Sequence, residues 1–248
     1  MDLKIPKRLK KEPLLEAIWE LRFKSIESIP VGEILPGILY QAMQKDYPVF
    51  TRLPVPDFPP DLLVQNPDLR YMVKVRLEST TTPFIIQIGP QIVSLNCRRP
   101  YAGWGQFKNK ILELVSVLKN TNLIGHPERL ALRYLDLLQV RERSLLSCLR
   151  IKIDLAGDLI TDCPLHLRTE QHKNSLLHVL QVTSPSVVQV TPDKKETGIL
   201  VDLDVAYKQP DHIFENMDKM IETLHDASKQ RFFELLTEDA LKLMEPEY

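Results

Sequence analysis

The chain has 248 residues, 44% of them apolar and 26% charged, which is enough to bury a core and excludes a disordered or fibrous protein. Its 32 basic and 33 acidic residues give a net charge of −1, which excludes a global positive field that would attract nucleic acid or an anionic membrane. No stretch of about 20 residues is apolar enough to span a membrane, and residues 1–12 lack the apolar region of a signal peptide. Cys97, Cys148 and Cys163 are widely spaced and odd in number, so we expect no disulfide framework, no metal site and a cytoplasmic location.

The N-terminal part predicts a strand, a helix and a loop. Residues 17–24 alternate between apolar and charged side chains, the period of a strand. A helix is expected over residues 30–47, provided that Pro36 lies in its first turn. Residues 48–67 are rich in proline, which donates no hydrogen bond to a sheet, and therefore predict a long ordered loop.

A β-meander and a helix are predicted next. Three strands are expected over residues 71–78, 84–88 and 91–97, separated by turn signals. Residues 104–118 repeat apolar side chains at intervals of three and four, which predicts an amphipathic helix. A further strand is predicted over residues 130–140.

The second half of the chain repeats this pattern of strands followed by a helix. The strands are expected over residues 149–155, 165–168, 176–183 and 199–207. A long helix follows over residues 211–236, with Asp211 as its N-cap, and a short helix begins at Thr237.

Together these elements predict an α+β fold, with antiparallel β-meanders packed against amphipathic helices. We expect a basic leader over residues 1–12, an N-terminal half over residues 13–140 and a C-terminal half over residues 141–248, joined in one continuous domain. Each half contains a meander, a proline and a helix, which favours an internal duplication.

Four sequence strings carry a resemblance to a known family. They lie in residues 13–23 (PLLEAI, then RF), 101–107 (YAGW, then F), 129–136 (RLALRYLD) and 231–237 (RFFE, then LT). In combination they resemble a sporadically distributed prokaryotic family of conserved proteins of unknown function. In that family the third string usually ends in asparagine, where this chain has Asp136. The resemblance implies a prokaryotic origin and an α+β fold, and its patchy occurrence is similar to that of mobile or defence-associated genes.

The strongest candidate binding site combines arginines and aromatic residues. Planar guanidinium groups beside aromatic rings can hold a carboxylate, a phosphate or a base. The candidates are Arg129, Arg133, Tyr134, Tyr101 and Trp104. The alternative interpretation is structural, in which an arginine and an aspartate form a buried ion pair that fixes strand register and the aromatic rings belong to the core.

Carboxylates on a predicted strand are the candidate catalytic groups. Asp202 and Asp204 share one strand face about 7 Å apart, a separation that a general-acid pair or a metal ion could bridge. Asp136 and Arg133 complete the candidate set. An exposed sheet face is the ordinary location for such a pair, and no cofactor is predicted.

Two small basic groups could contact phosphates. Arg98 and Arg99 form one of them. The other lies in the leader and consists of Lys4, Lys7, Arg8, Lys10 and Lys11. The alternative interpretation of the leader is a solubilising tail.

These observations favour a non-enzymatic protein-interaction or accessory module. Residues 211–236 carry an apolar stripe longer than one small sheet needs, which predicts self-association or a partner surface. The alternatives are a carboxylate-dependent hydrolase or nucleic-acid-processing enzyme, and a nucleic-acid-binding protein. Convergence of the carboxylates in one cleft would favour the enzyme, whereas dispersed carboxylates together with a broad apolar patch would favour binding.

Overall fold

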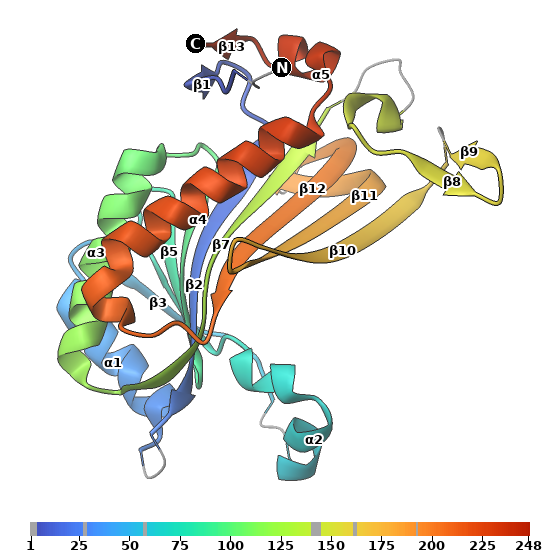
Figure 1. Cartoon of the computed structure of the whole chain (residues 1–248). Helices are drawn as coiled ribbons and strands as arrows, with labels where there is room; N and C mark the ends of the chain where they lie inside the picture. The colour runs from blue at the N-terminus through green and yellow to red at the C-terminus, as the bar shows by residue number, and fades with distance from the viewer. Residues whose placement is uncertain (1–3, 27–28, 57–58, 140–144, 161–162, 192) are drawn as a thin grey trace. The chain divides into compact units, whose positions relative to one another are not determined.

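The structure, a computed structural model, describes residues 4–26, 29–56, 59–139, 145–160, 163–191 and 193–248. It confirms the α+β fold. A nine-stranded antiparallel sheet has the strand order β10-β11-β12-β7-β2-β6-β5-β4-β3, and the long helix α4 packs on it (Figure 1).

The chain divides into two compact units, and each combines segments from both halves of the sequence. Unit 1 consists of Met1–Leu15, Arg133–Val205 and Thr223–Tyr248, and unit 2 of Glu16–Leu132 and Ala206–Glu222. Four elements continue from one unit into the other: β2 (Leu14–Ser25), β7 (Ile124–Leu138), β12 (Lys194–Lys208) and α4 (Ile213–Leu235). The boundary predicted between residues 140 and 141 lies outside the described residues, as does Val140, the end of a predicted strand.

Unit 2 is a set of antiparallel strands with helices on one face. Its strands are β3 (Val49–Arg52), β4 (Val75–Glu78), β5 (Phe84–Gly89) and β6 (Ile92–Arg98), together with most of β2, residues 124–132 of β7 and residues 206–208 of β12. The helices α1 (Val31–Met43) and α3 (Trp104–Thr121) contact each other, and they contact β5 and β6 respectively (Figure 1).

Alternation along β2 decides which face the helices cover. Trp19 and Leu21 are fully buried, and Trp19 lies opposite Leu95 of β6. On the same face, Phe84 of β5 stacks on Phe107 of α3 with ring centroids 6.3 Å apart. The apolar face of the sheet therefore packs on the helices, and the strand predicted from its period is confirmed.

Two predictions for the N-terminal part are wrong. Pro36 lies inside α1, beyond the first turn, where the helix tolerates it because its burial offsets one missing backbone hydrogen bond.

Residues 48–67 do not form one loop, since they contain β3 and the short helix α2 (Pro60–Gln65). β3 itself contains no proline, and as the last strand of the sheet it needs hydrogen bonds from β4 alone.

The strands of unit 1 are longer than their local sequence predicts. β10 (Leu165–Lys173) pairs with β11 (Leu176–Thr191) in continuous antiparallel register, and this pairing extends β10 through polar residues of low strand propensity. A small hairpin of β8 (Ile153–Leu155) and β9 (Asp158–Ile160) precedes them, after the 3₁₀ turn η2 (Leu145–Cys148).

Both chain ends lie side by side in unit 1. β1 (Arg8–Leu9) pairs with β13 (Pro246–Glu247), which follows α5 (Glu238–Leu243) (Figure 1). The helix start predicted at Thr237 is confirmed, because the Thr237 side chain accepts a hydrogen bond from the backbone of Ala240 at 3.3 Å.

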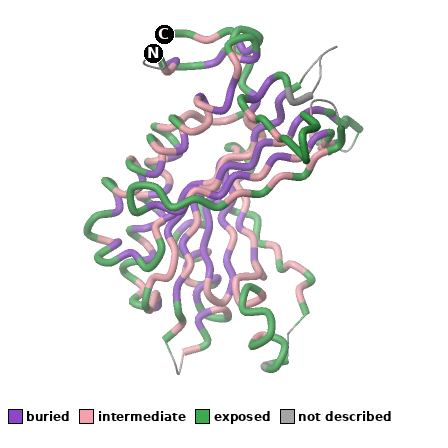
Figure 2. Tube along the Cα trace, turned by 45° about the vertical axis from the view of Figure 1, so that its right-hand side comes forward, coloured by how far each residue is buried: buried purple, intermediate pink, exposed green. Residues whose placement is uncertain are grey.

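The apolar stripe of α4 is buried within the chain. Ile213, Met217, Ile221 and Leu224 are buried at helical spacing, while the outer side of the helix is exposed (Figure 2). The helix begins at Ile213, so Asp211 lies before the N-cap position and the cap prediction is wrong. The helix packs on the sheet.

We expect opposite effects from two glycine-to-alanine substitutions. A Cβ at Gly198 in β12 would lie 2.3 Å from the carbonyl oxygen of Leu138 in β7, so Gly198→Ala should destabilise the protein by about 1–3 kcal/mol. A Cβ at Gly37 in α1 would meet nothing within 4 Å, so Gly37→Ala should stabilise it by about 0.5–1 kcal/mol. Urea unfolding measures both, and an unchanged midpoint for Gly198→Ala would contradict this close approach of the strands.

Candidate functional site

The candidate catalytic residues Arg133 and Asp202 form an ion pair in unit 1. Nε and Nη2 of Arg133 donate to Oδ1 and Oδ2 of Asp202 at 2.7 and 2.5 Å, and Nε2 of Gln181 donates to Oδ2 at 3.1 Å. The Asp202 side chain is buried, and both of its oxygens accept hydrogen bonds from neighbouring strands. This geometry fits the structural interpretation, because the pair ties β7 to β12.

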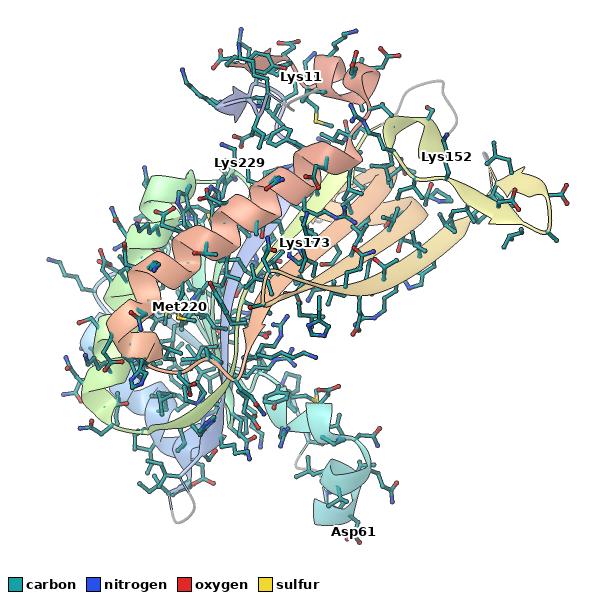
Figure 3. All side chains as sticks on the ribbon, in the orientation of Figure 1. Lys11, Asp61, Lys152, Lys173, Met220 and Lys229 are labelled. Atoms are coloured by element: carbon teal, nitrogen blue, oxygen red, sulfur yellow. The ribbon has the colours of Figure 1, made fainter. Side chains whose placement is uncertain are left out.

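The other candidate carboxylates do not gather around this pair. Tyr134 is the neighbour of Arg133 in β7, and its hydroxyl lies 3.0 Å from Nδ1 of His225 in α4. Alternation therefore directs Tyr134 and Asp136 toward the helix and Arg133 away from it. Asp202 and Asp204 share the face of Arg133, and side chains extend from both faces of these strands (Figure 3). The three carboxylates are thus divided between two faces, and within the described residues no three His, Cys, Asp or Glu side chains form a potential metal site.

The predicted cluster of aromatic residues and Arg129 does not form in unit 2. The Trp104 ring packs edge-on against Phe107, and its Nε1 donates to Oε2 of Glu222 in α4 at 3.1 Å. Nη1 of Arg129 instead donates to Oε1 of Glu20 at 2.6 Å. Glu20 follows Trp19 in β2 and faces away from the helices, so Trp104 and Arg129 lie on opposite faces of the sheet. Tyr101 also packs edge-on against Phe107.

The predicted basic groups lie beside acidic partners or on the surface. Lys11 lies 2.6 Å from Glu245 and lowers the pKa of that carboxyl through a hydrogen bond, and Lys10 lies 3.6 Å from Glu247. Arg8 and Leu9 of the leader also pair with β13, so this part of the leader is held against the C-terminal segment. Nε of Arg98 lies 3.9 Å from Glu16. Arg99 is exposed.

Sequence reasoning missed a second cluster, on the charged face of unit 2. Its centre is Tyr71, the last residue of the 3₁₀ turn η1 (Pro67–Tyr71). The Cζ atoms of Arg22 and Arg70 lie 4.6 and 4.9 Å from the centroid of the Tyr71 ring, distances at which a guanidinium and an aromatic ring attract each other. We call Arg22, Arg70, Tyr71, Glu20, Glu128 and Arg129 the guanidinium–tyrosine cluster.

Carboxylates of two strands organise this cluster. Oε1 of Glu20 accepts from Nε of Arg22 at 2.7 Å as well as from Arg129, so one carboxylate serves two guanidinium groups. The hydroxyl of Tyr71 donates a hydrogen bond to Oε2 of Glu128 at 2.5 Å. Burial raises the pKa of Tyr71 to about 12, and the hydrogen bond to Glu128 and its negative charge contribute to the increase.

The sequence carries a local pattern for only some residues of the guanidinium–tyrosine cluster. The alternation of residues 17–24 places Glu20 and Arg22 on the polar face. Arg70 and Tyr71 adjoin the proline-rich segment, and nothing local indicates that they reach β2. Their partners come from β2 and β7, which are far from them in the sequence.

No family model matches this chain, and no curated protein matches it. The helices in the described part of the chain include none that is both long and apolar enough to cross a membrane.

We expect Glu128→Gln to lower the pKa of Tyr71 from about 12 toward about 10, because the substitution removes the negative charge beside the phenol. Absorbance of the phenolate at 295 nm measures the titration, and subtracting the curve of a Tyr71→Phe variant isolates Tyr71. A pKa that stays near 12 in the Glu128→Gln variant would contradict the role of this carboxylate. Since the folded pKa is raised, the contribution of Tyr71 to stability is present below about pH 10 and lost as the pH rises toward 12.

We expect a double-substitution cycle at Arg133 and Asp202 to show a structural role. Arg133→Met leaves a buried carboxylate without its main partner and should destabilise the protein by about 1–3 kcal/mol. The double variant with Arg133→Met and Asp202→Leu should recover most of this loss, because it leaves no unpaired charge. Urea unfolding of the four proteins measures the coupling, and additive effects of the two substitutions would exclude it.

Proposed function

We propose that this chain is a non-enzymatic protein-interaction module of the prokaryotic cytoplasm, from the family whose strings it resembles, and an accessory protein of a mobile or defence-associated locus. The observation that carries the proposal is the dispersal of the candidate carboxylates. Asp202 accepts two hydrogen bonds from Arg133, and Asp136 belongs to the opposite face of the sheet. Both oxygens of Asp202 already accept hydrogen bonds from Arg133 and Gln181, which supports a structural role for this carboxylate.

The docking surface that we propose is the charged face of unit 2, opposite α1 and α3. The α4 stripe, the surface expected from the sequence, is buried on the chain's own sheet. On the charged face the side chains hold one another in place. Glu16, which is partly exposed, is held by two buried side chains beneath it: Nδ2 of Asn96 donates to Oε1 of Glu16 and Oγ of Ser94 donates to Oδ1 of Asn96, both at 2.9 Å.

Such a face suits recognition of a folded or extended protein. Arginine and tyrosine are enriched at protein interfaces, where their contacts dominate the binding energy. The side chains of Arg22 and Arg129 are already fixed by Glu20, so binding loses less side-chain entropy than it would with free arginines. Paired charges of both signs favour a protein surface over a polyanion, because a nucleic acid requires an excess of positive charge.

The test is affinity purification of the tagged full chain from its native host, with and without nuclease. We expect a stoichiometric protein partner that survives nuclease treatment, and we expect the purified partner to bind the purified chain again. The double variant of Arg133 and Asp202 serves as a matched control from unit 1 and should retain the partner.

Two outcomes would overturn the proposal. A partner that disappears with nuclease would indicate nucleic-acid binding through the basic groups. An enzyme would be indicated by two results together. The eluate would contain no stoichiometric protein, and the chain would turn over a substrate with an activity that the Asp202→Asn variant loses.

A further inference from the structure

We infer that two copies of this chain associate through the outer edge of β10 (Leu165–Lys173), which pairs antiparallel with β10 of the second copy about a twofold axis at Thr169. The inference concerns unit 1 and does not rest on the proposed function. Three properties of β10 support it: its unpaired edge, its self-complementary charges and the single register that those charges favour.

One edge of β10 has no strand beside it in the described part of the chain. β10 is an end strand of the large sheet, and all nine of its residues pair with β11 along the other edge (Figure 1). Alternate residues of such a strand direct their backbone N–H and C=O groups outward, where a further strand can exchange hydrogen bonds with them. An added strand is therefore the ligand that this edge fits.

β10 lacks two features by which proteins commonly block an edge. The strand contains no proline, and its register with β11 runs without a bulge along its whole length. The strand at the other end of the sheet, β3, has only four residues, and prolines follow it at positions 54 and 56. Of the two end strands, β10 is therefore the longer and the less protected.

Charged side chains protect an edge when they repel a second strand, but those of β10 attract one. Arg168 and Glu170 lie on one face of the strand and form an ion pair with each other. Their side chains are 48% and 50% exposed, so both can also reach a second copy. With the axis at Thr169, Arg168 of each copy lies directly opposite Glu170 of the other, with Cβ atoms about 4.5–5.5 Å apart. The four charges then alternate in sign around a square.

The charges select this register over its neighbours. A twofold axis perpendicular to the sheet keeps each side chain on its own face, so residues that face each other are an even number apart in the sequence. Moving the axis by one residue in either direction places Arg168 opposite Arg168, or Glu170 opposite Glu170, and like charges directly opposite destabilise a strand pair. At the axis itself Thr169 faces Thr169, a favourable pair because threonine hydroxyls can bond across strands. The remaining pairs oppose no like charges at pH 8: His166 with His172, Leu167 with Gln171, and Leu165 with Lys173.

A second copy fits this edge better than an unrelated peptide, because one sequence supplies both members of each charge pair. A twofold contact makes every interaction twice, and it uses the β10 edge of both copies, so association through this edge stops at two. With nine residues from each copy the contact is smaller than a standard interface, and we expect a reversible dimer with a Kd on the order of 10 µM.

The experiment is sedimentation of the full chain at pH 8 over concentrations from about 1 to about 500 µM, with a trace of the same chain carrying a fluorescent label. We expect a monomer–dimer equilibrium for the unmodified chain. Arg168→Glu and Glu170→Arg should each weaken dimerisation by at least about tenfold, because each places like charges opposite each other twice. Mixing the two variants should restore a dimer within about threefold of the original affinity, since the acids of one variant then face the arginines of the other.

Matched variants separate position from net charge. Arg76 and Glu78 form the same kind of pair two residues apart in β4, a strand with neighbours on both edges, so Arg76→Glu should leave dimerisation unchanged. Glu78→Arg has the same net charge as Glu170→Arg, but it should bind labelled Arg168→Glu several-fold more weakly than Glu170→Arg does. Circular dichroism of each variant confirms that it is folded.

The inference would be overturned by an unmodified chain that stays monomeric up to about 500 µM. It would equally be overturned if Arg168→Glu and Glu170→Arg dimerise as the unmodified chain does, because the contact would then lie elsewhere. Two weakened variants whose mixture recovers no dimer, or an equal recovery with Glu78→Arg, would contradict the register centred on Thr169.

Discussion

The two-residue period of β2 is the constraint on which the rest of unit 2 depends. Trp19, Leu21 and Phe23 are fully buried on one face of this strand, and a shift of one residue would place Glu20 and Arg22 there instead. Because the apolar face must be covered, α1 and α3 pack on it. The opposite face then carries charged side chains from β2 and β7, and these meet Arg70 and Tyr71 of η1 in the guanidinium–tyrosine cluster.

Arginine stabilises the partly buried acids in both units. Arg133 binds Asp202 through two hydrogen bonds in unit 1, and Arg22 and Arg129 share Glu20 in unit 2. A guanidinium remains charged at any ordinary pH and offers a planar set of donors, so it can compensate a carboxylate that has lost water. The same pairing occupies acceptor positions on Asp202 and Glu20 with donors from the chain itself.

The chain ends add a second constraint, in unit 1. β1 pairs with β13, and the leader lysines lie beside acids that follow α5. A basic segment that would otherwise attract phosphates is thereby partly neutralised.

The sequence by itself determined the elements whose signals are local. The period of residues 17–24, the apolar stripe of α3 and the cap at Thr237 each depend on neighbours within a few residues, and the structure confirms them. Only the tertiary structure decided that part of the proline-rich segment forms a strand, because β4 supplies the hydrogen bonds that the segment lacks. The same holds for the partners of Asp202 and Tyr71, which come from strands distant in the sequence. Which strands become neighbours depends on the packing of the whole sheet, and no local pattern of residues encodes it.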